Sequence, residues 1–160
     1  MPIFDLESLL TIIETYIKAN LNDKITKINA EKASLGFSPN LDAPLIKDDA
    51  FFLTLDDRVS NFNPYIYYGI GPSSVDAIRG KAAKRPVVFM YVIHNAISGD
   101  DAYKRMLRYI RALEEVMDDM SGETELCDLE LSTLTPADIQ DLDTSAFHKV
   151  AGVEVTTTIA

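Results

Sequence analysis

The sequence contains a single cysteine, no tryptophan and only two histidines among its 160 residues. The lone Cys127 excludes an internal disulfide and is typical of a protein from a reducing compartment. Cys127 lies in an alternating apolar pattern, which favours a packing role over a nucleophilic one. No apolar run reaches the length that crosses a bilayer, because charged or polar residues interrupt each one. Residues 1–5 contain no basic side chain, so we expect no secretory signal.

Basic side chains are also scarce. The chain carries 15 basic and 25 acidic side chains, which gives a net charge of −10 at pH 7. Nucleic-acid binding requires a basic surface, so we expect no nucleic acid and, without an apolar span, no membrane among the partners. The charge is uneven: residues 1–80 sum to −4, residues 81–120 to +1 and residues 121–160 to −7. This division allows an acidic face of one copy to meet a more basic face of another, although solubility alone also accounts for the negative charge.

Residues that bind metals or carry catalysis do not occur in the spacings that such sites use. His94 and His148 lie in or beside predicted strands, where they are candidates to meet across a sheet around a metal. Asp128 and Glu130 are the candidates for a third ligand. Neither histidine shows the H-x-x-x-H spacing of metal sites, so a structural role is the stronger interpretation. No serine or cysteine has the flanking signature of an activated nucleophile, and we expect no enzyme, cofactor or resident metal.

The clearest pattern is an apolar stretch over residues 85–94, followed by helical periodicity over residues 98–120. Both faces of the first stretch are apolar, which predicts a central strand that is covered on both sides. The second stretch predicts a long amphipathic helix with one apolar stripe. The stripe consists of Tyr103, Met106, Leu107, Ile110, Leu113, Met117 and Met120. Basic residues precede acidic ones along this helix, an order that its dipole disfavours, so we expect a second surface or pairs such as Arg111–Glu115 to stabilise it.

The remaining elements are predicted from shorter patterns. Apolar residues at helical spacing predict a first helix over residues 6–21, and the asparagines and aspartate within residues 20–23 predict the turn that ends it. Residues 24–30 predict a strand, and turn residues predict a long loop over residues 34–50. Ser121 and Gly122 are expected to end the long helix. Further strands are predicted at 51–55, 65–70, 125–134 and 147–159, with short helices or turns at 72–78 and 136–142.

Together these elements predict a single α+β domain over residues 1–160. Its sheet is expected to be mixed and mostly antiparallel, flanked by the N-terminal helix and the long amphipathic helix. The 34–50 loop and a basic link over residues 79–85 are expected to be internal flexible segments. The link holds a basic cluster without an acid, and we predict that it contacts an acidic partner surface. The candidate interface residues of the link are Arg79, Lys81, Lys84 and Arg85.

The last predicted strand, residues 147–159, alternates cleanly and contains no proline. An unprotected strand edge normally pairs with another chain. We therefore expect this strand to promote self-association, in a head-to-tail arrangement that avoids open fibres by closing into a ring.

The layout of the chain also carries a resemblance. Its parts are the opening helix through Leu21, the strand over residues 86–93, the arginine-bearing helix around residues 105–111 and the last strand over residues 150–155. In order and spacing these resemble the small tail-completion proteins of tailed bacteriophages, which include tail terminators and head–tail joining proteins. The resemblance implies an α+β subunit without catalytic residues. It further implies a ring, typically a hexamer, that caps the tail tube or joins it to the head within the virion, after assembly in the bacterial cytoplasm.

Two other classes of function stay open. One is an enzyme that binds a small ligand or metal in a pocket near Tyr67, Tyr91 and His94. The other is a cytoplasmic protein-binding adaptor unrelated to phage. Genes for tail-tube and tape-measure proteins beside the coding sequence would favour the virion protein over both.

Overall fold

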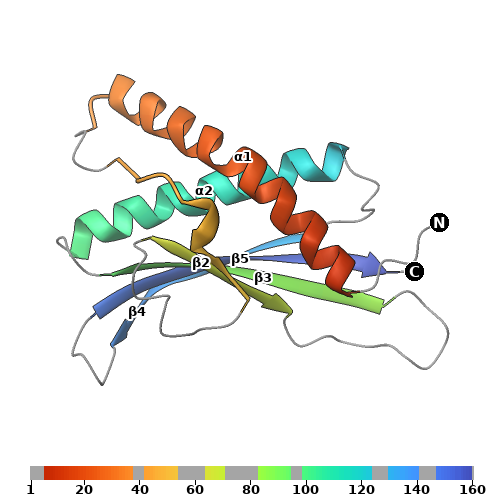
Figure 1. Ribbon diagram of the computed structural model, residues 1–160. Helices are drawn as coiled ribbons and strands as arrows, with labels where there is room; N and C mark the ends of the chain where they lie inside the picture. Colours follow the sequence, from red (N-terminus) through yellow and green to blue (C-terminus); the bar gives the residue numbers. More distant parts are fainter. Residues whose placement is uncertain are drawn as a thin grey trace.

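The computed structural model describes residues 6–37, 42–53, 64–70, 83–94, 99–123, 130–140 and 147–159. Within these ranges two long helices lie over a sheet (Figure 1). The helices are α1 (Leu6–Ser34) and α2 (Gly99–Glu123), and a single 3₁₀ turn (Asp48–Ala50) precedes the first strand. The strands are β1 (Phe51–Phe52), β2 (Tyr65–Ile70), β3 (Ala83–His94), β4 (Glu130–Gln140) and β5 (Phe147–Ile159).

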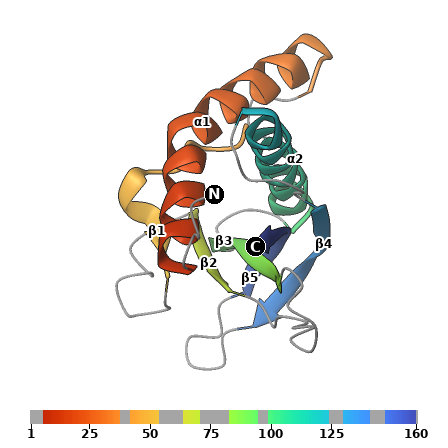
Figure 2. The same cartoon turned by 90° about the vertical axis from the view of Figure 1, so that its right-hand side faces the viewer.

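The strands are ordered β1-β2-β3-β5-β4. β1 runs parallel to β2, and each of the other neighbouring pairs is antiparallel. α1 and α2 lie side by side on one face of the sheet, as both views show (Figures 1 and 2). The expected mixture of helices and sheet is therefore confirmed in its coarse form, as two helices packed together beside a small parallel pair of strands.

The first helix is longer than its predicted span. α1 continues to Ser34, so the predicted turn within residues 20–23 and the predicted strand over residues 24–30 are both wrong. The physical reason is an apolar stripe that continues through both segments at helical spacing and is almost fully buried. Its members are Ile13, Ile17, Leu21, Ile25 and Ile28.

Two asparagines of α1 hold an extended segment against the helix instead of forming a turn. The Asn22 amide nitrogen donates to the Ile46 carbonyl at 2.8 Å, and its oxygen accepts from the Ile46 N–H at 2.9 Å. Asn29 makes the same pair of bonds with Ala43, at 2.9 and 3.0 Å. Positions 22 and 29 share a helix face because they are two turns apart, so the two amides fix residues 42–46 along α1. Ala43 and Ile46 are buried there.

Gly36 ends α1 in a left-handed conformation, with φ of 83°. The Phe37 N–H donates to the Lys32 carbonyl at 3.0 Å, and the Gly36 N–H donates to the Ala33 carbonyl at 3.0 Å. These two bonds form a Schellman cap. The cap turns Phe37 back toward the last turn of the helix, where the Lys32 ammonium lies 5.3 Å from the ring centroid.

Replacing Gly36 with alanine should lower the free energy of unfolding by about 1 kcal/mol, the cost of a side chain at positive φ. A Cβ at this position would meet nothing within 4 Å, so backbone strain is the whole of the expected cost. Urea denaturation measures the loss. Gly36→Asn should lose less, because asparagine tolerates the left-handed region. Equal stability of the alanine variant and the native protein would contradict the cap.

β3 is a central strand, as predicted, because it pairs with β2 on one side and β5 on the other. We expected both faces of this strand to be covered. The two described helices, α1 and α2, lie on the same face of the sheet (Figure 1). β5 also differs from expectation. It pairs with β3 and with β4 along its length, so the predicted free edge of residues 147–159 is wrong, and β1 and β4 are the outer strands.

Three further elements, β4, α2 and β1, begin or end at residues other than those predicted. β4 runs over Glu130–Gln140 with a register shift between Leu134 and Ala137, so the helix or turn predicted from residue 136 is wrong. Pro136 falls at that shift in an outer strand, where a missing N–H is tolerated. α2 continues through Ser121 and Gly122 to Glu123. β1 ends at Phe52, and the helix predicted over residues 72–78 lies outside the described residues.

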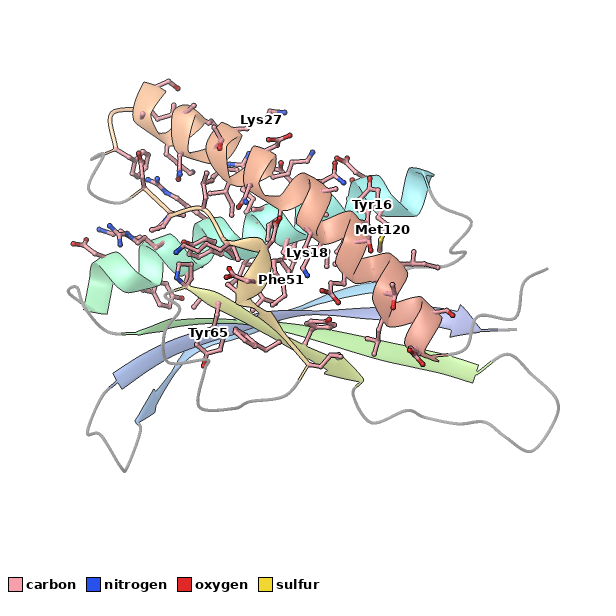
Figure 3. The ribbon with its side chains drawn as sticks, in the orientation of Figure 1. Tyr16, Lys18, Lys27, Phe51, Tyr65 and Met120 are labelled. Carbon is pink, nitrogen blue, oxygen red and sulfur yellow. The ribbon has the colours of Figure 1, made fainter. Side chains whose placement is uncertain are left out.

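Among the side chains that the structure describes, the buried apolar ones lie on the two helices, on the 42–50 segment and on β2. Residues of both helices and of β2 are buried together in one apolar cluster. The Lys18 ammonium lies 5.1 Å from the Phe51 ring centroid (Figure 3). The rings of Phe52 and Tyr65 pack edge to face with centroids 6.0 Å apart. The first contact attaches β1 to α1, and the second joins β1 to the start of β2.

Three tyrosines of this core are buried: Tyr65, Tyr68 and Tyr109. The Tyr68 hydroxyl donates to the Glu14 carboxylate, and the Tyr109 hydroxyl donates to the Pro44 carbonyl at 2.6 Å. Burial raises the pKa of all three above the ordinary value of 10.0, and the hydrogen bond to Glu14 raises the pKa of Tyr68 further. The folded chain therefore holds these protons more tightly than the unfolded chain does.

Stability should consequently fall at alkaline pH. Because the folded-state pKa values are raised, the stabilisation is complete below about pH 10 and is lost as the pH rises toward the folded-state values. We expect the urea midpoint to decrease as the pH rises above about 10, with tyrosinate absorbance from these residues appearing as the chain unfolds. Tyr68→Phe should show a shallower decrease. A midpoint independent of pH over this range would contradict the burial of the three hydroxyls.

Candidate functional site

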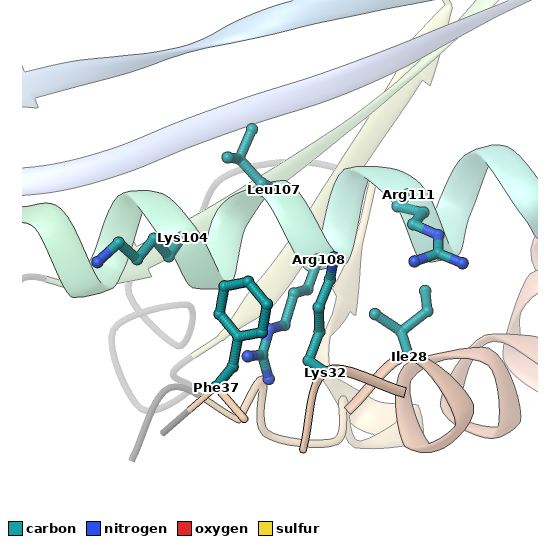
Figure 4. A pocket seen from close by; sticks show the side chains of 7 residues that line it. All are labelled: Ile28, Lys32, Phe37, Lys104, Leu107, Arg108 and Arg111. Atoms are coloured by element: carbon teal, nitrogen blue, oxygen red, sulfur yellow. The ribbon is translucent and has the colours of Figure 1, made fainter. Parts of the chain in front are cut away.

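A basic cavity lies where the end of α1 meets the first half of α2. On α2, Lys104, Arg108 and Arg111 are spaced by four and three residues and so share one helix face. On α1, Ile28 and Lys32 are four residues apart and face them. The cavity has a volume of about 310 Å³ (Figure 4). Its lining consists of Ile28, Lys32, Phe37, Lys104, Leu107, Arg108 and Arg111; these residues are the basic cavity throughout.

Arg108 forms the polar inner wall of the basic cavity. Its side chain is only 6% exposed, and its Nη1 donates to Asn29 Oδ1 at 3.0 Å and to Asp42 Oδ1 at 3.0 Å. A buried cation is costly unless it is paired and hydrogen-bonded. Arg108 is therefore occupied in joining α2 to α1 and to the 42–46 segment, which Asn29 also holds.

Arg111 lies nearer the surface and is also occupied. Its two terminal nitrogens donate to the Glu31 carboxylate at 2.8 and 2.7 Å, and its Nε donates to Glu115 at 2.9 Å. The hydrogen bond from Arg111 holds the pKa of Glu31 below its ordinary value, and the same bond raises the pKa of Arg111. The predicted Arg111–Glu115 pair is confirmed. The second surface that was expected to stabilise α2 is α1, which also contributes Lys24 to Asp119 at 2.6 Å.

The two lysines of the basic cavity differ from the arginines. Neither Lys32 nor Lys104 forms an ion pair with another described residue. Beside them lie two large apolar side chains that remain open to solvent, Phe37 at 48% and Leu107 at 46% exposed. The mouth of the cavity thus combines two available ammonium groups with apolar surface, which suits an anionic group attached to an apolar one.

The difference between the two arginines is testable. Arg108→Ala should lower the free energy of unfolding by about 2–3 kcal/mol, because it removes two charge-assisted hydrogen bonds from a buried side chain. Arg111→Ala is the matched control from the same helix face, and it should cost much less because its ion pairs are exposed. Thermal and urea denaturation measure both losses. Equal losses would show that the buried Arg108 network is not what joins the helices.

Of the candidate interface residues of the predicted basic link, the structure describes the strand positions of Lys84 and Arg85. Lys84 and Arg85 belong to β3, where they are opposite Thr158 and Thr157 of β5. Arg79 and Lys81 lie outside the described residues. Sequence reasoning missed the basic cavity because its α1 half was expected to be a strand and a loop. The spacing of the α2 cations was the available indication.

Of the pocket predicted near Tyr67, Tyr91 and His94, the structure describes the backbone register of these positions. Tyr91 is opposite Ile66 and Tyr67 is opposite Met90. Tyr67 and Tyr91 are therefore one position out of step in the pairing of β2 with β3.

The two histidines do meet in the register, because His94 is opposite His148 between β3 and β5. Glu130 is opposite Thr156, eight residues farther along β5 than His148. At the rise of a strand this is about 26 Å away, so Glu130 is excluded as a shared ligand, and Asp128 lies outside the described residues. Among the side chains that the structure describes, no group of three or more His, Cys, Asp or Glu is arranged to hold a metal.

Sequence comparison finds no protein family and no curated protein that matches this chain. In the described part of the chain, neither helix has the length and apolar character that a membrane span requires. A functional proposal therefore rests on the layout of the chain and on the surfaces that its residues form.

Proposed function

We propose that the chain is a structural protein of phage or prophage virions, similar to tail terminators and other tail-completion proteins. In this proposal its subunit has an α+β fold with a mostly antiparallel sheet flanked by two helices. It acts without catalysis, by associating with copies of itself into a ring that caps the tail tube or joins tail to head. Its partners are other copies, six in all by resemblance, and tube or connector proteins. It is found in the tail or neck of the virion after assembly in the host cytoplasm.

The observation that carries this proposal is the exposed apolar surface where α1 ends and α2 begins. Large apolar side chains left in solvent mark surfaces that another protein covers. Leu35 is 63% exposed and Tyr103 is 40% exposed, and Tyr103 lies one turn before the half-exposed Leu107 of the basic cavity. Two members of the α2 apolar stripe therefore face away from the core of the subunit.

The arrangement of the sheet changes which surface the ring would use. Because β5 is enclosed by β3 and β4, its edge cannot pair with a neighbour. β4 is an outer strand, but Pro136 and the register shift at Leu134 interrupt its edge, and such features discourage strand addition. Contact through the helix ends is therefore the more favourable route to self-association.

The test is assembly on the tube. The purified chain should be mixed with tail tubes made from the tube protein encoded beside it, and examined by electron microscopy and light scattering. We expect rings at the tube ends, since subunits of this kind assemble most readily on a template. Bare tube ends, with the chain monomeric both alone and with tubes, would reject the virion role. A cytoplasmic adaptor, which the same exposed surface also allows, would give that result.

A further inference from the structure

The two available cations of the basic cavity stand out in a chain with a net charge of −10. Arg108 and Arg111 are occupied by Asn29, Asp42, Glu31 and Glu115. Lys104 is exposed, and the Lys32 ammonium lies over the exposed Phe37 ring (Figure 4). Lysine and phenylalanine side chains held in this way keep their charge and their apolar face available to a partner at the same time.

The size of the cavity limits what enters it. At about 310 Å³ it is at the lower end of ligand-binding cavities, which accommodates a few peptide residues but not a folded surface. The apolar part of its lining is formed by Ile28, Phe37 and Leu107. An apolar side chain that contacts Phe37 and Leu107, with a carboxylate near each lysine, would match both parts of the lining.

We propose that the basic cavity binds an acidic peptide segment of a second copy of this chain, one that presents an aliphatic side chain between carboxylates. This inference rests on the proposed self-association and names the surface that one copy offers to the next. Charge complementarity identifies the occupant. Residues 121–160 contain 8 acidic and 1 basic side chains, and they include the run Asp141-Leu142-Asp143, in which a leucine stands between two carboxylates.

Direct binding tests the inference without requiring a ring. The probe is a fluorescently labelled synthetic peptide with the sequence of residues 140–146, Gln-Asp-Leu-Asp-Thr-Ser-Ala, titrated with the full chain and followed by anisotropy. We expect saturable binding that weakens as salt increases, because Lys104 is exposed and Lys32 is only partly buried. Lys32→Glu with Lys104→Glu should weaken binding by roughly tenfold or more, since both attractive contacts become repulsive.

Matched variants separate the site from general charge. Lys27→Glu with Lys47→Glu makes the same change in net charge at two exposed lysines outside the basic cavity, and binding should be unchanged. Leu107→Ser should weaken binding, and its fold should be retained because the side chain is half exposed. A peptide with both aspartates changed to asparagine should bind several-fold more weakly, by loss of the two charge contacts. Circular dichroism of each variant confirms that it is folded.

Several outcomes would overturn the inference. If the Lys27 and Lys47 changes weaken binding equally, the binding is general electrostatic attraction and not recognition by the basic cavity. If the asparagine peptide binds as tightly as the original, the carboxylates are not recognised. Full displacement by inorganic phosphate at the peptide's own concentration would make a small anion the occupant. If the chain with Lys32→Glu and Lys104→Glu still forms normal rings on tubes, the basic cavity is not the contact between copies, and the virion role stays intact. A bound peptide with no ring from the native chain would refute the virion role alone.

Discussion

Two asparagine amides bind the backbone of an extended segment to the first helix, and the arrangement of the two helices depends on that contact. A buried backbone must have its N–H and C=O groups paired. Asn22 and Asn29 supply those pairs for residues 42–46 from within a helix. The segment then presents Asp42 and the Pro44 carbonyl to α2, where Arg108 and Tyr109 bind them. α1 and α2 are thus joined through a strip of polar contacts beside their shared apolar core.

The basic cavity is a consequence of this joint. Because Asn29 accepts from Arg108 at 3.0 Å, the end of α1 is held beside the first half of α2. The Gly36 cap then turns the chain so that Phe37 lies over Lys32 instead of continuing the helix. A cavity with both apolar and cationic lining follows from a helix cap and a buried arginine, neither of which is itself a binding feature.

The sequence predicted α2, β3 and β5 well because each has a long pattern of one period. It failed at α1 because β-branched residues such as Ile25 and Ile28 favour strands by local propensity, and because Asn22 is a turn-forming residue by local preference. The partner that decides the matter, Ile46, lies 24 residues away from Asn22. Of the site, the spacing of the α2 cations was visible, whereas the α1 half required this long-range contact. Such contacts override local propensity and leave no local pattern.

The helix surface can bind an acidic partner only through basic side chains that are not already paired within the subunit, so the total number of basic residues on α2 matters less. The cationic character of α2 is largely neutralised within the subunit, because Arg108 and Arg111 bind acidic groups on or beside α1. Within the basic cavity, the two lysines remain to attract an acidic partner, and exposed ion pairs contribute little affinity. Most of the binding free energy of any partner must therefore come from covering Phe37, Leu107 and their apolar neighbours. The lysines then act mainly on orientation and on the rate of encounter.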